Sequence, residues 1–91
     1  MKVTVYPTHN SPKTVVISSF ADIQKLVGGR IEIAKETSMG DLLFGVASDY
    51  KPISTTPNKH YPNLYGEVVL APKGWRDDLM GTDVAWSDLP D

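Results

Sequence analysis

Residues 19–33 constrain the fold more than any other segment, because they combine a helix start, a helix stop and a strand start. Ser19 followed three residues later by Asp22 is a capping-box pattern, and apolar residues then recur at helical spacing. Gly28 and Gly29 end that pattern and are typical of a helix C-terminus. The next four residues alternate like a half-buried strand. The segment therefore predicts a short helix that turns directly into a strand.

The remaining strands are predicted from alternation or β-branched composition at residues 1–6, 13–17, 42–47 and 66–71. Val3 and Val5 point to one face of the first of these strands and Tyr6 points to the other. The second is most simply the antiparallel partner of the first. A polar turn is expected over residues 35–41. The order ββαβββ predicts an α+β domain of two layers, a mostly antiparallel sheet with one short helix on one face.

Length and charge predict one domain with an acidic end. The 91 residues suffice for one core, expected over residues 1–76. Residues 77–91 are expected to be an irregular acidic segment with short helical turns around residues 77–80 and Trp86, packed on the domain or extending from it. Five aspartates and no basic residue lie in this segment, whereas nine basic and six acidic residues precede it. The segment either keeps the protein soluble, mimics an acidic partner or covers a basic face.

The composition argues against membrane segments and covalent cross-links. No apolar run approaches the roughly 18 to 20 residues of a membrane helix, and the N-terminus lacks the apolar core of a signal peptide. The chain has no cysteine, which excludes disulfides and thiolate zinc sites. We therefore expect a cytoplasmic protein without membrane contact.

The best candidate for a binding site is the segment over residues 49–65. In a compact domain, connections without secondary structure that exceed roughly 12 to 15 residues are uncommon, and this segment is longer than that. It is either a binding loop or a loop that packs on its own aromatic side chains. Besides Tyr50 in the same loop, the candidate ligand-binding residues are Arg30, Asn58, Lys59, His60, Tyr61, Tyr65 and Arg76.

These residue types suit a nucleotide. Aromatic rings stack on bases, lysine and arginine neutralise phosphates, and an amide reads base edges. The same mixture suits a protein interface, where tyrosine and arginine are enriched. Asn58 alternatively orders the loop through backbone hydrogen bonds.

No pattern predicts an enzyme, a metal centre or a cofactor. His9 and His60 have no partner at metal-ligand spacing. The adjacent Asp77 and Asp78 are more simply solvated than catalytic. The glycine pair follows a helix, whereas the glycines of a phosphate-binding loop precede one. We therefore expect no catalytic residues.

Residues 23–33, which read IQKLVGGRIEI, resemble the hallmark of a family of short domains of unknown function found mainly in phages, prophages and mobile elements. In that family a helix ends LVGG before an aromatic or basic residue and I-E. Residues 56–59 and 65–71 match, in order, its proline-asparagine-basic stretch and its glycine followed by a valine-rich strand. Lys59 stands where arginine is commoner. The resemblance covers most of the chain and implies a phage or mobile-element protein in a bacterial host.

Together these features predict a non-enzymatic accessory protein that acts by binding. Its most concrete form is an anti-defence sponge that sequesters a nucleotide immune signal. Because so small a domain rarely encloses a dinucleotide, the pockets are expected between copies of a homo-oligomer. The alternative is a protein-protein inhibitor of a host defence or metabolic enzyme that uses the acidic segment. A small hydrolase would require His9 or His60, and direct nucleic-acid binding is disfavoured by the charge distribution.

Overall fold

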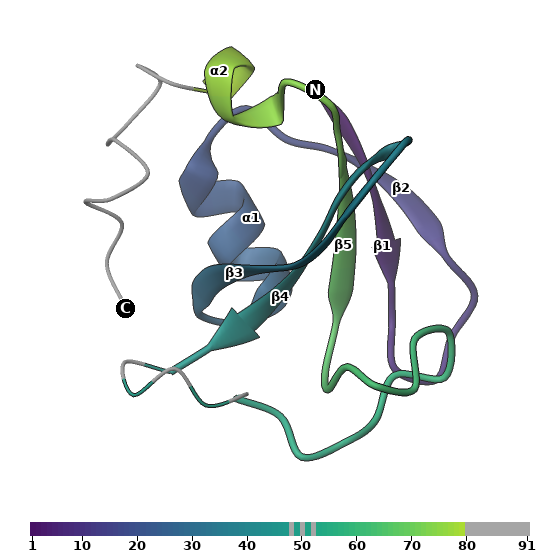
Figure 1. Ribbon diagram of the computed structural model, residues 1–91. Helices are drawn as coiled ribbons and strands as arrows, with labels where there is room; N and C mark the ends of the chain where they lie inside the picture. Colours follow the sequence, from purple (N-terminus) through teal and green to yellow (C-terminus); the bar gives the residue numbers. More distant parts are fainter. Residues whose placement is uncertain (48, 50, 52, 80–91) are drawn as a thin grey trace.

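The computed structural model describes residues 1–47, 49, 51 and 53–79, and its strands form one five-stranded antiparallel sheet of order β2-β1-β5-β4-β3 (Figure 1). The elements are β1 (Lys2–Tyr6), β2 (Lys13–Val16), α1 (Phe20–Val27), β3 (Arg30–Thr37), β4 (Gly40–Val46), β5 (Val68–Pro72) and α2 (Trp75–Leu79). The predicted α+β class and the antiparallel pairing of the first two strands are therefore confirmed. The expectations for Tyr50, for Trp86 and for the rest of the segment from residue 80 onward lie outside the described residues.

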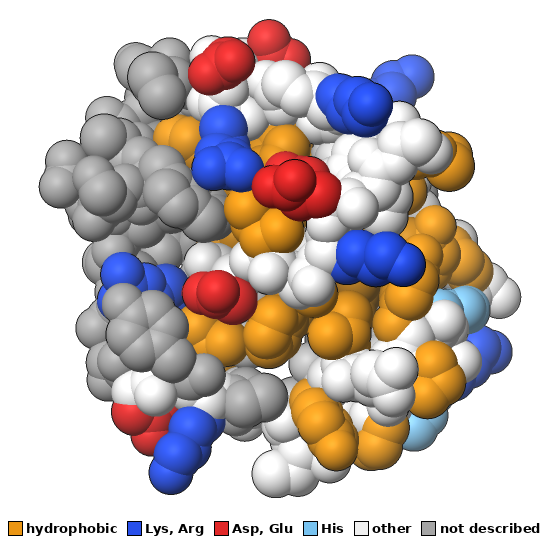
Figure 2. Space-filling model, in the orientation of Figure 1, with side chains coloured by type: hydrophobic (Ala, Val, Ile, Leu, Met, Phe, Trp, Pro, Cys, Tyr) orange, Lys and Arg blue, Asp and Glu red, His pale blue; other side chains and the backbone are white. Residues whose placement is uncertain are grey.

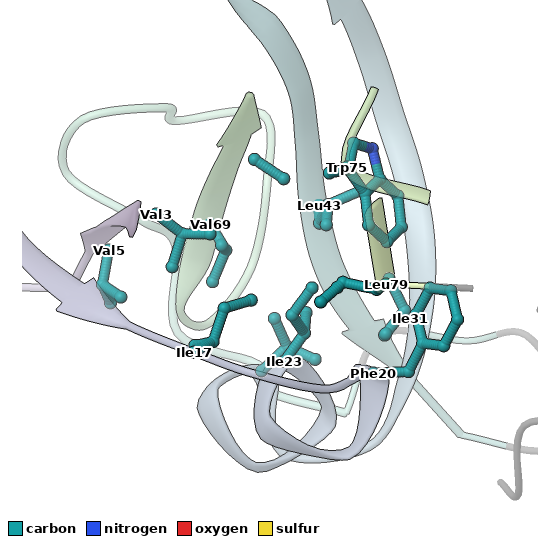
Figure 3. Close-up of a cluster of buried hydrophobic side chains, with 12 residues drawn as sticks. Val3, Val5, Ile17, Phe20, Ile23, Ile31, Leu43, Val69, Trp75 and Leu79 are labelled. Atoms are coloured by element: carbon teal, nitrogen blue, oxygen red, sulfur yellow. The ribbon is translucent and has the colours of Figure 1, made fainter. Parts of the chain in front are cut away.

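Helix α1 connects the two edge strands of the sheet, β2 and β3, and packs against one face (Figure 1). The hydrophobic core lies between α1 and this face of the sheet (Figure 3). It contains Val3, Val5, Ile17, Phe20, Ile23, Val27, Ile31, Leu43, Val69, Ala71, Trp75 and Leu79. Burial of these apolar side chains is the main stabilising contribution to the fold.

The ends of α1 follow the predicted capping residues. The hydroxyl oxygen of Ser19 accepts a hydrogen bond from the backbone N–H of Asp22 at 3.3 Å. Gly28 adopts a left-handed conformation with φ of 83°, and the N–H groups of Gly28 and Gly29 both donate to the carbonyl of Gln24. This arrangement satisfies the carbonyl of Gln24 near the helix end and turns the chain into β3.

The predicted polar turn over residues 35–41 is wrong, because most of it lies in strands. Lys35 pairs with Leu42 and Thr37 with Gly40, so only two residues turn the chain. The hydroxyl of Thr37 donates to the carbonyl of Gly40 at 2.7 Å and closes the hairpin. A register shift next to Ala34 interrupts the alternation of side chains. Because this part of β3 is an exposed edge, its charged composition resembles that of a loop.

The second helix, α2, spans the boundary expected at residue 76 and contains most of the helical turn expected around residues 77–80. Trp75 and Leu79 are buried in the core. The rings of Trp75 and Phe20 make an edge contact, with 5.9 Å between their centroids. Trp75 therefore covers part of the core. Packing against α1 stabilises a helix of five residues that would not form alone.

The sheet face opposite α1 has its own buried side chains. Leu42, Val46 and Val68 are at most 5% exposed but do not belong to the core cluster under α1. Tyr6 lies on this face and contacts rings from the loop between β4 and β5. That loop therefore folds over part of the second face. Within the described part of the chain, no helix is long and apolar enough to span a membrane.

Candidate functional site

Asn58 is the centre of the loop between β4 and β5. Its side chain is fully buried, and its amide nitrogen donates to the carbonyls of Tyr6 at 2.7 Å and Gly66 at 2.9 Å. Its amide oxygen accepts from the backbone N–H groups of His60 at 2.9 Å and Tyr61 at 3.3 Å. These bonds use both donors and both acceptor positions of the amide. Asn58 thus orders the loop, and its amide has no capacity left to read a base edge.

The loop residues that follow Asn58 are held against β1. The ring centroid of Tyr6 lies 5.0 Å from that of Tyr61 and 5.5 Å from that of His60, both in edge arrangements. The Nε2 atom of His60 lies 2.7 Å from the carbonyl oxygen of Asn10, and since a carbonyl only accepts, this nitrogen carries a proton. The backbone N–H of Lys59 donates to the carbonyl of Thr8 at 3.0 Å, while its side chain is exposed.

Tyr61 stays neutral near physiological pH. Burial raises the pKa of its phenol, and a hydrogen bond with the side chain of Tyr6 raises it further. Tyr61 therefore presents an aromatic ring and a hydroxyl group without negative charge.

A groove of about 550 Å³, here called the sheet groove, opens beside these rings on the face opposite α1. Its floor includes Tyr6, Leu42 and Leu70, one wall is formed by residues 60–64, and the other is formed by the β3–β4 hairpin from Ala34 to Met39. Figure 2 shows a band of hydrophobic side chains that leads across the viewed face toward the pale-blue histidines. Lys35 is the only Lys, Arg, Asp or Glu among the described lining residues.

The structure does not bring all seven candidate residues together. His60 and Tyr61 line the sheet groove, with Lys59 on the same turn and Asn58 behind it. Tyr65 lines a different, smaller pocket beside the end of α1.

The two arginines lie elsewhere. Arg30 begins β3 opposite Val46 and is not among the described lining residues of the groove. Arg76 belongs to α2, where its guanidinium lies 3.8 Å from the carboxylate of Asp41 and 5.8 Å from the ring centroid of Trp75. The indole N–H of Trp75 donates to the same carboxylate at 2.8 Å. Arg76 is thus part of a contact that fixes α2 to β4.

Sequence reasoning missed several residues of the groove, namely Tyr6, Lys35, Met39, Leu42 and Leu70. The alternation of the first strand placed Tyr6 on the face away from Val3 and Val5, which was a usable signal. Lys35 and Met39 cannot be found in this way, because the polar composition of residues 35–41 predicts a turn. Within the described residues, no group of three or more His, Cys, Asp or Glu could hold a metal ion.

The fold and this groove define a small α+β domain with a ligand-sized hollow on the open face of its sheet. Comparison of the chain with protein-family models, with curated proteins and with solved structures finds no match.

Proposed function

We propose that this protein is a non-enzymatic accessory protein of a phage or mobile element that binds a small nucleotide in the sheet groove and sequesters it in the cytoplasm of a bacterial host. The observation that carries the proposal is the lining of the groove. It combines an apolar, aromatic floor with one positive charge and no negative charge among the described residues. A volume of about 550 Å³ is within the range of about 300 to 1,000 Å³ typical of small-molecule sites.

A nucleobase fits the apolar part of the groove. Tyr6, Tyr61 and His60 supply rings, and Leu42 and Leu70 contribute apolar atoms between the two walls. Stacking of a base on such rings contributes about 1 to 3 kcal/mol per base and tolerates different bases. Hydroxyl groups of Tyr6 and Tyr61 provide polar contacts.

The phosphate of the same ligand would pair with Lys35. Its side chain is exposed on the hairpin wall, and Lys59 adds a second exposed positive charge on the turn of the opposite wall. Charge-assisted hydrogen bonds to phosphate are stronger than neutral ones. The groove is formed within one chain, so a ligand of this size does not require a pocket between copies.

Self-association is proposed as a separate property, through the edge strand β2. Met1 and Ile17 exchange both of their backbone hydrogen bonds, at 2.8 and 3.0 Å. Since bonded and non-bonded pairs alternate in an antiparallel ladder, the N–H and C=O groups of Thr14 and Val16 point away from β1. These groups can pair with the same groups of a second copy around a two-fold axis at Val15.

The occupant we favour for this edge is a second copy, because the pairing is self-complementary. Val16, which is 71% exposed, would lie opposite Thr14 of the other copy, and β-branched residues are favourable cross-strand partners. Lys13 would lie opposite Ile17, so no like charges face each other. The other edge, β3, has a register shift at Ala34 and several charges, which protect an edge from pairing.

Isothermal titration calorimetry tests the nucleotide proposal. The protein is titrated with cyclic di- and trinucleotides and with ADP-ribose derivatives, and we expect saturable heat with at least one of them. Lys35→Gln should weaken that binding about tenfold, because it removes the charge and keeps most of the length of the side chain. Lys73→Gln, at an exposed position in the turn before α2, is the matched control and should bind like the wild type.

Two results would overturn the proposal. The absence of heat with every ligand, from a folded sample, would remove nucleotide binding. Recovery of a chemically altered nucleotide after denaturation would remove the non-enzymatic assignment, whereas recovery of the intact nucleotide supports it.

The second candidate function is inhibition of a host protein. It is favoured by the apolar floor of the groove and by Met39, which is 74% exposed on its rim, because methionine adapts to protein surfaces. A pull-down from host lysate compares the full chain with residues 1–79, since Leu79 belongs to the core and must be kept. Loss of one specific partner on truncation supports an inhibitor that uses the acidic segment, and identical partners argue against it.

A further inference from the structure

A second, smaller pocket lies between the C-terminal end of α1 and the segment that leads into β5. Its volume is about 240 Å³, and its lining includes Leu26 and Val27 from α1, Gly45 from β4 and Glu67 directly before β5. It shares no described lining residue with the sheet groove. The two hollows are therefore separate candidate sites.

Glu67 is the unusual residue of this pocket. Its Oε2 atom is buried and makes no hydrogen bond. Within the described residues, it is the only buried side-chain nitrogen or oxygen atom without a hydrogen-bond partner. Burial of a carboxylate oxygen without a partner is costly. A ligand that pairs with this oxygen would recover part of that cost.

The surroundings of Glu67 favour a positive ligand. The carbonyl end of α1 carries partial negative charge and borders the pocket at Val27 and Gly28. Hydroxyl groups of Thr8, Ser54 and Thr56 lie in the lining and can accept hydrogen bonds. No Lys, Arg or His is among the described lining residues, so no positively charged side chain of the lining competes for the carboxylate.

The rest of the lining distinguishes between kinds of cation. A calcium ion takes about six to eight oxygen ligands, usually with several carboxylates, and this pocket offers one carboxylate. Leu26, Val27 and Ile53 instead provide apolar surface for an alkyl chain. Tyr65, which is 40% exposed, adds an aromatic ring, and such rings attract cations.

We propose that this pocket binds a short primary alkylammonium ion, with its ammonium group on Glu67 and its alkyl chain along Leu26, Val27 and Ile53. The volume of about 240 Å³ is below the range of drug-sized sites, which limits the ligand to a few carbon atoms. This site does not depend on nucleotide binding in the sheet groove.

Nuclear magnetic resonance titration of the full chain with n-butylammonium chloride at constant ionic strength tests the proposal. We expect saturable shifts of the backbone amide signals of Gly28, Gly45, Gly66 and Glu67. n-Butanol, which has the same alkyl chain and no charge, should bind at least about tenfold more weakly. Equal binding of the two compounds, or no saturable shift with n-butylammonium, would overturn the proposal.

Two variants test whether the ammonium group pairs with Glu67. Glu67→Gln keeps the shape of the side chain, removes its charge and should weaken n-butylammonium binding about tenfold, whereas Glu36→Gln on exposed β3 should leave it unchanged. Tyr65→Leu offers an independent readout, because it should weaken n-butylammonium more than n-butanol. Undiminished binding to Glu67→Gln, or saturation of the same amides by calcium chloride, would contradict an alkylammonium site.

Discussion

The side-chain amide of Asn58 joins β1, its own turn and Gly66 at one buried point. Asn58→Asp replaces its two N–H donors with an oxygen that faces the carbonyls of Tyr6 and Gly66. We expect the free energy of unfolding in urea to fall by about 3 kcal/mol, because two buried acceptors lose their donor and a charge is buried. Nuclear magnetic resonance spectra should show the largest shifts in the turn from His60 onward.

The matched control is Asn63→Asp, the same change at an exposed position of the same loop. It should alter the free energy of unfolding by less than about 0.5 kcal/mol. Equal losses from the two variants would contradict the role that the hydrogen bonds give to Asn58.

Single residues of the candidate site could be predicted only in part. The sequence pointed to His60 and Tyr61 by their chemistry, and left open whether Asn58 binds a ligand or orders the loop. Its partner Tyr6 is 52 positions away in the chain, so their contact depends on β1 lying beside β5. Local patterns carry no information on that neighbourhood.

The cap of α1 should make stability depend on pH. The Asp22 carboxylate accepts hydrogen bonds from the backbone N–H and the hydroxyl of Ser18, at 2.8 and 3.1 Å, and these bonds lower the pKa of Asp22 below its ordinary value of 3.8. A lowered pKa in the folded state stabilises the protein above the ordinary value, and this contribution is lost as the pH falls through the lowered pKa.

Asp22→Asn should therefore lower the melting temperature at pH 7, and the difference from the wild type should shrink in strong acid. Circular dichroism melts over a series of pH values measure this difference. Glu36→Gln, at an exposed position of β3, serves as the control. A difference that stayed constant down to strong acid would show that the charge of Asp22 is not responsible.

The close approach of α1 to β4 depends on Gly45. A Cβ atom at this position would overlap the carbonyl oxygen of Val27, which is backbone and cannot rotate away. We expect Gly45→Ala to lower the free energy of unfolding by about 2 to 3 kcal/mol, because the helix must shift from the sheet. Urea denaturation measures the loss.

Gly74→Ala separates crowding from backbone strain. Gly74 has φ of 80°, and a Cβ atom added there would meet no other atom within 4 Å, so only the left-handed backbone opposes a side chain. We expect Gly74→Ala to lower the free energy of unfolding by about 1 kcal/mol. If Gly45→Ala lowers the free energy of unfolding no more than Gly74→Ala does, α1 can move away from β4 without loss of stability.

The elements with strong local signals were the ones that sequence reasoning predicted best. Ser19 and the glycine pair fixed the ends of α1, because capping depends on neighbours in the chain. The β3–β4 hairpin was misplaced, since its strands carry charges at an exposed edge and its alternation breaks at Ala34. The short helix α2 depends on the burial of Trp75 and Leu79 against distant residues, which local propensity does not encode.

The arrangement of the whole sheet leaves β2 and β3 as edges. β2 carries one charge, Lys13, and no register shift, whereas β3 carries several charges and a register shift at Ala34. If two copies pair through β2, only about four backbone hydrogen bonds join them, so the association should be weak, with a dissociation constant of about 0.1 mM. Sedimentation velocity over a concentration series measures it.

Val16→Pro tests this pairing without disturbing the hairpin, because the N–H of Val16 points away from β1 and proline is tolerated at such edge positions. It removes half of the donors of the symmetric pair and should abolish association. Val16→Thr keeps the N–H and the β-branched shape, and should associate like the wild type. Nucleotide binding should be the same in both variants, since the sheet groove lies within one chain. If Val16→Pro associates as strongly as the wild type, β2 is excluded as the interface.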